Sequence, residues 1–224
     1  MPLDVGSEEV ARVLRDVARI GPYFEILTGD GVGGGGWQPF PGDPARLAAL
    51  TGDYAERLGT GERRVAASLL FQGLAARLWS PVVAAASLGV VPDLGGLRWR
   101  VEPVGVGLVE PRGWRADDLA WVAERLHVMV VDGLLRPLYE SMLTFVNLAD
   151  GLVWGNAASA LVGSLNVGPG AGVRRGLVRE LLTREPLAGV GTWGPHGFVR
   201  RNCCLYYRVP GGGMCGDCGL RPGM

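Results

Sequence analysis

The four cysteines of this chain all lie within its last 22 residues, and no other cysteine is available to pair with them. They form the pattern C-C-x10-C-x2-C, made by Cys203, Cys204, Cys215 and Cys218. Four thiolates are the usual complement for zinc or for an iron–sulfur cluster. The clustering therefore predicts a metal-binding segment at the C-terminal end of the fold, and not cysteines scattered through a core.

The adjacent pair Cys203–Cys204 bears on the choice of metal. Neighbouring side chains in an extended chain point to opposite faces, so both sulfurs can be ligands only if the backbone turns there. Structural zinc sites favour two spaced pairs, whereas a two-iron cluster offers two metal centres to four thiolates. We therefore expect a [2Fe–2S] cluster. A structural zinc site is one alternative.

A redox-active dithiol is the other alternative, because Cys215-Gly-Asp-Cys218 has the C-x-x-C spacing. Thioredoxin-like dithiols open a helix within a strand–helix–strand unit, and no such unit surrounds this motif. His196 precedes the first cysteine by seven residues. A Rieske centre needs two histidines in place of two cysteines, so this histidine is a weak candidate. His127 falls in a predicted helix and is expected to be packed or solvated.

The formal net charge is zero but unevenly distributed: residues 174–224 carry +5 and the remainder −5. Arg200, Arg201 and Arg208 flank the cysteines and would offset the −2 charge of an oxidised cluster, favouring its reduced form. All 22 basic residues are arginine. We attribute this to compositional bias and predict no nucleic-acid partner.

The first 20 residues carry several charges, whereas a secretory signal needs an uncharged apolar core. The uncharged stretch 78–92 is too short for a membrane span, and the stretch 151–173 contains six glycines and Pro169. We therefore expect no integral membrane segment. A cytoplasmic location follows, where cysteine clusters favour metal over disulfides.

Hydrophobic periodicity predicts a mainly α fold with a minor β hairpin. The hairpin is expected within residues 97–110, and little regular structure after residue 186. We expect a helical substrate-docking domain over residues 1–185 and a cluster-binding module over residues 186–224. Helices are expected at 8–19 with Ser7 as cap, 44–58, 62–79, 82–88, 117–146 with a kink at Pro137, 152–165 and 173–182.

The cysteine segment resembles the ferric-siderophore reductase family of the FhuF type. The resemblance rests on C-C-x10-C-x2-C, on the preceding arginine and on the L-Y-Y-R that follows the first pair. Trp154-Gly155-Asn156 is similar to the W-G-N segment of that family. The likeness is closest over residues 200–219.

The resemblance implies that Cys203, Cys204, Cys215 and Cys218 ligate a [2Fe–2S] cluster. It also implies a helical domain similar to the iron-transport domain of aerobactin-type siderophore synthetases. The implied activity is one-electron reduction of a ferric siderophore, of hydroxamate type, in the cytoplasm. The electron donor would be a ferredoxin, a flavin reductase or a small reductant. Hard oxygen ligands hold ferric iron far better than ferrous iron, so one electron loosens the complex.

Candidate docking residues for such a chelate surround the predicted hairpin, where charge and stacking could act together. They are Arg98, Arg100, Arg112, Arg115, Trp99 and Trp114. Trp193 and Tyr206–Tyr207 could pack over the cluster and exclude water. Two other functions stay open: an electron carrier without a siderophore substrate of its own, and a zinc-stabilised binding module.

Overall fold

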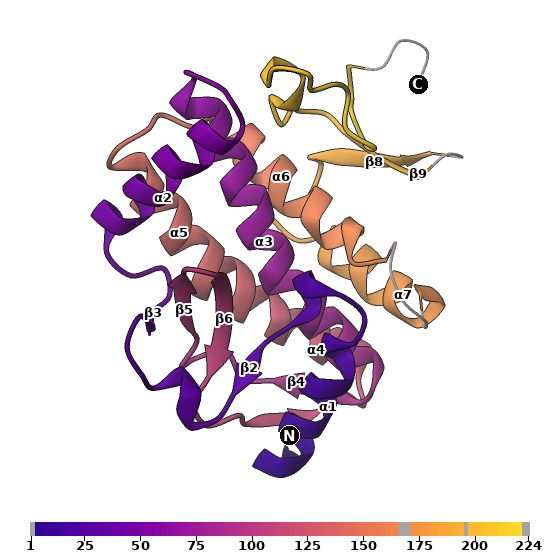
Figure 1. The fold of residues 1–224 in the computed structure, drawn as a ribbon. Coiled ribbons are helices and arrows are strands. Elements are labelled where there is room, and N and C mark those ends of the chain that lie inside the picture. Colours follow the sequence, from indigo (N-terminus) through magenta and orange to yellow (C-terminus); the bar gives the residue numbers. More distant parts are fainter. Residues whose placement is uncertain (1–2, 166–170, 195–196, 221–224) are drawn as a thin grey trace.

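The computed structural model describes residues 3–165, 171–194 and 197–220, and shows a mainly α fold with small sheets (Figure 1). The longest helix, α3 (Arg63–Ser87), runs through the middle and packs along α6 (Asp150–Gly163). The other helices are α1 (Ser7–Ala18), α2 (Pro44–Arg57), α4 (Leu119–Leu126), α5 (Arg136–Leu143) and α7 (Ala171–Leu181). Short 3₁₀ turns occur at Pro22–Phe24, Asp30–Val32 and Tyr206–Arg208.

The predicted N-terminal helix is confirmed as α1, with its apolar stripe of valines and a leucine buried. The predicted cap is wrong: Gly6 occupies the N-cap position and Ser7 is the first helical residue. The next helix, α2, is capped at its N-terminus by Asp43. The Asp43 carboxylate accepts a hydrogen bond from the Ala45 N–H at 2.9 Å, and Pro44 follows it in the first turn.

The predicted break at Pro81 is wrong, because α3 continues through this residue to Ser87. A proline inside a helix removes one hydrogen bond and costs about 3 kcal/mol. Trp79, Pro81, Val82 and Val83 are all buried. Burial of this stretch on several sides outweighs the local cost of the proline.

The predicted helix over residues 117–146 is a continuous helical run from Leu119 to Leu143, whose hydrogen-bonding pattern changes before Pro137. The expected kink at Pro137 stays a prediction. Helix α4 leads into a π-helical stretch, His127–Leu135, and α5 then begins at Arg136. Pro137 therefore stands in the first turn of α5, where its missing N–H costs little. Asp118 caps α4 by accepting from the Trp121 N–H at 2.6 Å.

The predicted hairpin is confirmed as β5 (Arg98–Val101) and β6 (Val104–Leu108), antiparallel with Trp99 opposite Val106. It forms the centre of a four-stranded sheet in the order β2-β6-β5-β3, where β2 is Leu27–Thr28 and β3 is Gln38–Pro39. A second, antiparallel sheet has the order β1-β7-β4. Its strands are β1 (Asp4–Val5), β7 (Gly113–Arg115) and β4 (Val90–Pro92).

The expectation of little regular structure after residue 186 is corrected by a third, two-stranded sheet. Strands β8 (Gly191–Gly194) and β9 (Gly197–Arg200) pair antiparallel, with Gly191 opposite Arg200. Phe198 of β9 lies 5.8 Å from the ring of Trp193 and belongs to the main hydrophobic core. The following segment lies beside the ends of α3 and α6 (Figure 1). The division at residue 185 stays a prediction.

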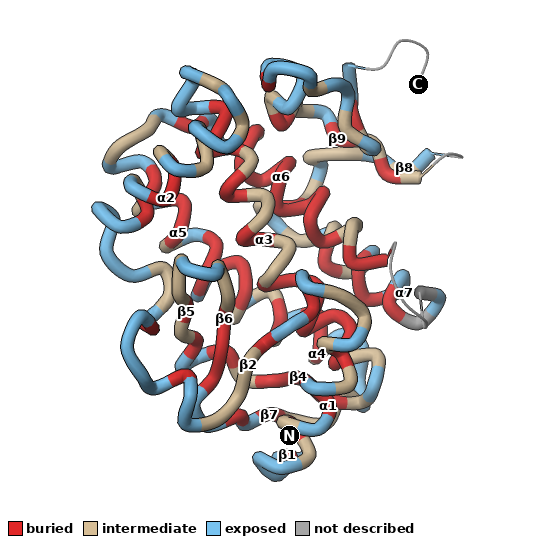
Figure 2. The backbone as a smooth tube through the Cα atoms, viewed as in Figure 1, coloured by how far each residue is buried: buried red, intermediate tan, exposed pale blue. Residues whose placement is uncertain are grey.

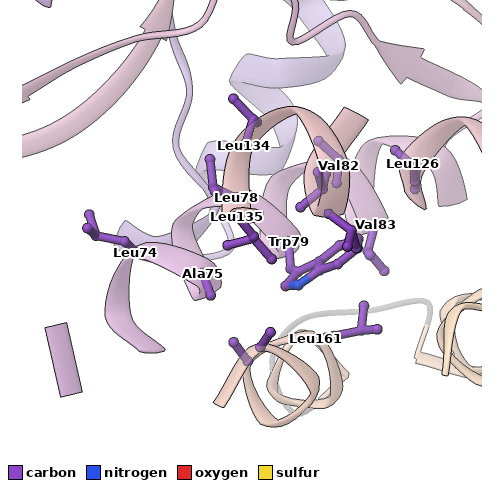
Figure 3. Packing of buried hydrophobic residues seen from close by; sticks show 14 of the residues in the cluster. Leu74, Ala75, Leu78, Trp79, Val82, Val83, Leu126, Leu134, Leu135 and Leu161 are labelled. Atoms are coloured by element: carbon purple, nitrogen blue, oxygen red, sulfur yellow. The ribbon is translucent and has the colours of Figure 1, made fainter. Parts of the chain in front are cut away.

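The core is built around α3 (Figure 2). Its Trp79 is fully buried and packs among aliphatic side chains from the π-helical stretch and from α6, including Leu135 and Leu161 (Figure 3). Among the described residues, α3 is the one helix long and apolar enough to cross a membrane, and 67% of its most apolar stretch is buried inside the protein. Such burial is that of a core helix.

Candidate metal centre

The fold brings the two halves of the cysteine pattern together. The Sγ atoms of Cys204 and Cys215 lie 3.6 Å apart. Two thiolates on one tetrahedral metal with bonds of about 2.3 Å lie about 3.8 Å apart, so this pair is spaced to chelate. Cys204 and Cys218 are each 2% exposed, whereas Cys203 and Cys215 are half-buried. The site is therefore closed on one side and open on the other.

The backbone turns directly after the adjacent cysteine pair, as a shared site requires. Leu205 adopts the left-handed conformation with φ of 71°, an uncommon state for a residue with a side chain. Its N–H donates to the Cys203 Sγ at 3.3 Å. An N–H directed at a sulfur stabilises negative charge there, so the strained residue orients a donor toward the site.

Cys204 and Cys215 share a proton. Their hydrogen bond is the main cause that lowers the pKa of Cys204 to about 6, and the Arg200 charge adds to it against the effect of burial. The same hydrogen bond, together with burial, raises the pKa of Cys215. The pKa of Cys203 is also raised, chiefly by burial. Metal ligands are thiolates, so a metal bound by this pair would release its protons.

The Cys204–Cys215 pair could bind a single metal ion or one iron of a cluster. Within the described part of the chain, no three histidine, cysteine or acidic side chains converge to hold one metal ion. A two-iron cluster asks for pairs of thiolates, two on each iron. Cys204 and Cys215 are spaced to supply one such pair, and Cys203 and Cys218 are the other two cysteines that would hold the cluster.

A buried ion pair connects the C-x-x-C turn to β9. Arg200 is 1% exposed, and its guanidinium donates to both carboxylate oxygens of Asp217, at 2.9 and 3.1 Å. Burial alone would lower the pKa of Arg200, but the hydrogen bonds and charge of Asp217 outweigh it and raise that pKa. Burial would raise the pKa of Asp217, and the same pairing lowers it. The Arg200 N–H also donates to the Asp217 carbonyl at 3.0 Å.

The same guanidinium extends the contact into the helical body. It donates to the Asn156 Oδ1 at 2.6 Å and to the Ser159 hydroxyl, both on α6. Asn156 in turn donates to the backbone oxygen and hydroxyl of Ser68 on α3, each at 2.9 Å. The Ser68 hydroxyl donates to the Cys204 carbonyl at 2.7 Å. We call Ser68, Asn156, Ser159, Arg200 and Asp217 the polar network. It ties both cysteine pairs to the core helices.

Gly151 of α6 lets the cysteine segment approach closely. A methyl group at Gly151 would lie 2.9 Å from the Asn202 side-chain nitrogen, and one at Gly155 would lie 3.5 Å from the Asn202 Cβ. Asn202 directly precedes the cysteine pair. In Trp154-Gly155-Asn156 the asparagine joins the polar network, whereas a methyl group at Gly155 would make only an ordinary contact with Asn202.

Of the three flanking arginines predicted to act on the site, Arg200 is the one whose charge reaches the sulfurs. Arg208 pairs with Glu62 at 3.0 Å on the surface. Arg201 is exposed, and its backbone N–H donates to Val190. His127 Nε2 lies 2.7 Å from the Glu185 carbonyl oxygen, which is a structural contact. His196 lies outside the described residues.

Of the residues proposed for docking around the hairpin, Arg112 directly precedes β7 and the others lie on β5 and β7, away from the cysteine segment (Figure 2). Trp99 is fully buried, and Arg98 donates to the Trp37 carbonyl at 3.1 Å. Arg115 makes a paired contact with Glu9 at 2.8 and 3.0 Å. The remaining three candidates also have protein partners. Arg100 lies over Trp37, Arg112 pairs with Glu110, and Trp114 has the Arg125 guanidinium over its ring.

Trp193 and Tyr206, in contrast, line a cavity together with Cys204 and Cys215, whereas Tyr207 is 51% exposed. The polar network includes residues that the sequence reasoning did not identify, namely Ser68, Ser159 and Asp217. The sequence carried one signal for Asp217. A carboxylate between two ligand cysteines lies close to negative sulfurs, and a neighbouring cation would stabilise its charge.

A protein-family model described as "FhuF 2Fe-2S C-terminal domain" matches residues 200–219 of the chain. The matched stretch contains all four cysteines together with Arg200 and Asp217. A search of curated proteins finds no match to the chain. The match covers the cysteine segment and not the helical body. It supports an iron–sulfur role related to siderophore iron handling for this segment.

Proposed function

We propose that the protein reduces a ferric siderophore by one electron and so releases ferrous iron. The observation that carries the proposal is the Cys204–Cys215 pair, spaced to chelate and lining a cavity, within a segment similar to a [2Fe–2S] domain. Cys203, Cys204, Cys215 and Cys218 would hold the cluster. The substrate would be of hydroxamate type, and the location cytoplasmic.

When bound, the cluster supplies one electron, passing from the reduced to the oxidised state as ferric iron in the chelate becomes ferrous. The chain's own groups hold and tune it. The polar network fixes both cysteine pairs to α3 and α6, and the buried charge of Arg200 offsets negative charge on the sulfurs. The Leu205 N–H adds a hydrogen bond to Cys203. The Leu205 N–H would favour the reduced state and raise the potential, whereas the Arg200 charge is opposed by that of Asp217 beside it.

The helical body would be the substrate-docking part, similar in this proposal to the iron-transport domain of siderophore synthetases. The electron would come from a ferredoxin, a flavin reductase or a small reductant. No bond of the siderophore need break, because hydroxamate oxygens bind ferrous iron far more weakly than ferric iron.

The test is anaerobic titration of the dithionite-reduced protein, freed of excess reductant, with a ferric trihydroxamate. We expect the visible absorption of the oxidised cluster to return, with one ferrous ion trapped by a ferrous-specific chelator for each cluster oxidised. A cluster that stays reduced beside the chelate would contradict the proposal and leave an electron carrier. A colourless, zinc-containing protein would leave a zinc-stabilised binding module.

A further inference from the structure

A cavity of about 750 Å³ opens beside the cysteine segment, where several parts of the chain meet, among them the Pro22–Phe24 turn and α7 at its edge. Helices α3 and α6 form its floor, and the end of α2, the β8–β9 hairpin and the C-terminal segment form its walls. Its volume lies within the range of about 300–1,000 Å³ found for small-molecule sites. Of the four cysteines, Cys204 and Cys215 line it.

The cavity wall combines aromatic rings with polar atoms that lack a protein partner. Tyr54, Trp193, Phe198 and Tyr206 supply the rings. Gln72 donates from its Nε2 to the Ser159 hydroxyl at 3.2 Å, but its buried Oε1 has no hydrogen-bond partner within the described chain. The buried indole N–H of Trp193 has no partner there either. Both atoms are buried beneath the surface of the wall, so the aromatic rings are what the cavity presents to a ligand.

The charge of the wall suits an uncharged chelate. Asp217 lies against the cavity but is paired with Arg200, and Arg175 lies exposed on its edge. Three hydroxamates neutralise ferric iron, so a ferric trihydroxamate can approach the negative cysteine site without strong repulsion. A tris-catecholate carries three negative charges and would be repelled.

We propose that this cavity is the docking site of the ferric siderophore, with the chelate facing the Cys204–Cys215 pair. The inference rests on the proposed function and adds its location. The aromatic rings would cover the organic frame of the chelate. The predicted docking surface around the β5–β6 hairpin is replaced by this cavity.

Two glycines in the cavity wall permit a direct test. Gly73 on α3 and Gly163 on α6 both line the cavity, and no heavy atom lies within 4 Å of a Cβ added at either. Gly73→Leu and Gly163→Leu therefore place a bulky side chain in the wall without forcing the fold apart. Gly73 also borders a second cavity, whereas Gly163 does not, so Gly163→Leu is the more specific variant.

Gly52→Leu is the matched control. Gly52 is a half-buried glycine of α2, also without a neighbour within 4 Å of an added Cβ, and it is not among the residues lining the cavity. All three substitutions put leucine for glycine in a helix, so they share any effect of helix propensity.

The first readout is calorimetric binding of a gallium(III) trihydroxamate to the full-length, cluster-loaded protein. Gallium(III) matches ferric iron in charge and size but does not accept the electron. We expect binding to wild type and to Gly52→Leu, and at least a tenfold loss of affinity in the other two variants. Absence of binding to wild type, or equal affinity in all four proteins, would overturn the inference.

The second readout separates this inference from the proposed function. We expect ferricyanide, which needs no docking site, to reoxidise the reduced cluster equally fast in all four proteins. Reoxidation by the ferric trihydroxamate should slow at least tenfold in Gly73→Leu and Gly163→Leu alone. Equal rates in every protein would overturn the docking site and leave the function intact. A wild-type cluster that reacts with ferricyanide but not with the ferric trihydroxamate would refute the proposed function. Binding of the gallium(III) trihydroxamate to the four proteins would then still show whether the cavity is the docking site.

Discussion

Replacing Arg200 by methionine should destabilise the whole C-terminal segment, because this side chain joins the C-x-x-C turn to α6. The substitution leaves the Asp217 carboxylate without its cation and the buried Asn156 Oδ1 without its donor. Breaking a buried ion pair costs about 3–5 kcal/mol. The Asp217 side chain keeps 18% exposure, so its share falls at the lower end of that range. A lost neutral acceptor adds about 1 kcal/mol.

We therefore expect the free energy of unfolding to fall by about 3–4 kcal/mol in Arg200→Met, measured by urea denaturation of the cluster-free, thiol-reduced protein. Arg200→Lys keeps the charge near Asp217 but loses the fork that reaches α6, so a loss of about 1–2 kcal/mol is expected. In the loaded protein, both variants should lose visible absorption to an iron chelator faster than wild type.

A double variant tests whether the unpaired Asp217 carboxylate causes the loss of stability in Arg200→Met. Arg200→Met/Asp217→Leu removes both charges, and apolar replacement of a whole buried pair is often neutral. It should recover at least about 2 kcal/mol relative to Arg200→Met. If Arg200→Met unfolds at the same urea concentration as wild type, or if the double variant is no more stable than the single one, the reasoning about the polar network is refuted.

Two further predictions concern other contacts. An added methyl at Gly219 would clash with the Arg200 carbonyl, so Gly219→Ala should displace the turn that carries the last cysteine. We expect it to lower the iron bound per chain, whereas Gly213→Ala, with no neighbour to meet, should not. The Tyr139 hydroxyl donates to Asp150 at 2.5 Å, and burial, with this bond, raises its pKa to about 12. The raised pKa stabilises the fold below pH about 10, and this contribution is lost as the pH rises through about 12. Tyr139→Phe should cost about 0.5–1.5 kcal/mol at pH 8 by urea denaturation, and an unchanged stability would contradict the contact.

Helix positions were largely predictable because apolar residues recur along α1, α4 and α5 at helical spacing. The break assigned at Pro81 was wrong because a local penalty was weighed without the burial that α3 gains on several sides. Strands of two or three residues were missed, since they are too short to show the alternation of apolar and polar residues that predicts a strand. The β8–β9 hairpin was missed because glycine-rich sequence carries no periodic signal.

The approach of Cys215 to Cys204 agrees with the expectation, drawn from the cysteine spacing, that the two cysteine pairs lie together. Binding of a cluster by all four cysteines stays a prediction. The polar network was not predictable from the sequence. Its contacts join residues 17 to 136 positions apart, such as Arg200 to Asp217 and Ser68 to Cys204, and no local pattern records such pairings. The docking residues expected around the hairpin show the same limit: Trp99 is a core residue, and only the fold reveals that.

The central claim is that the four cysteines hold a two-iron cluster, and metal and sulfide analysis of anaerobically purified protein tests it most directly. We predict two irons and two acid-labile sulfides per chain, with little zinc, and an electron paramagnetic resonance signal from one unpaired electron after dithionite reduction. Replacing Cys204 or Cys215 by serine should reduce or abolish this content. Stoichiometric zinc without sulfide, or a cluster unaffected by both substitutions, would contradict the account.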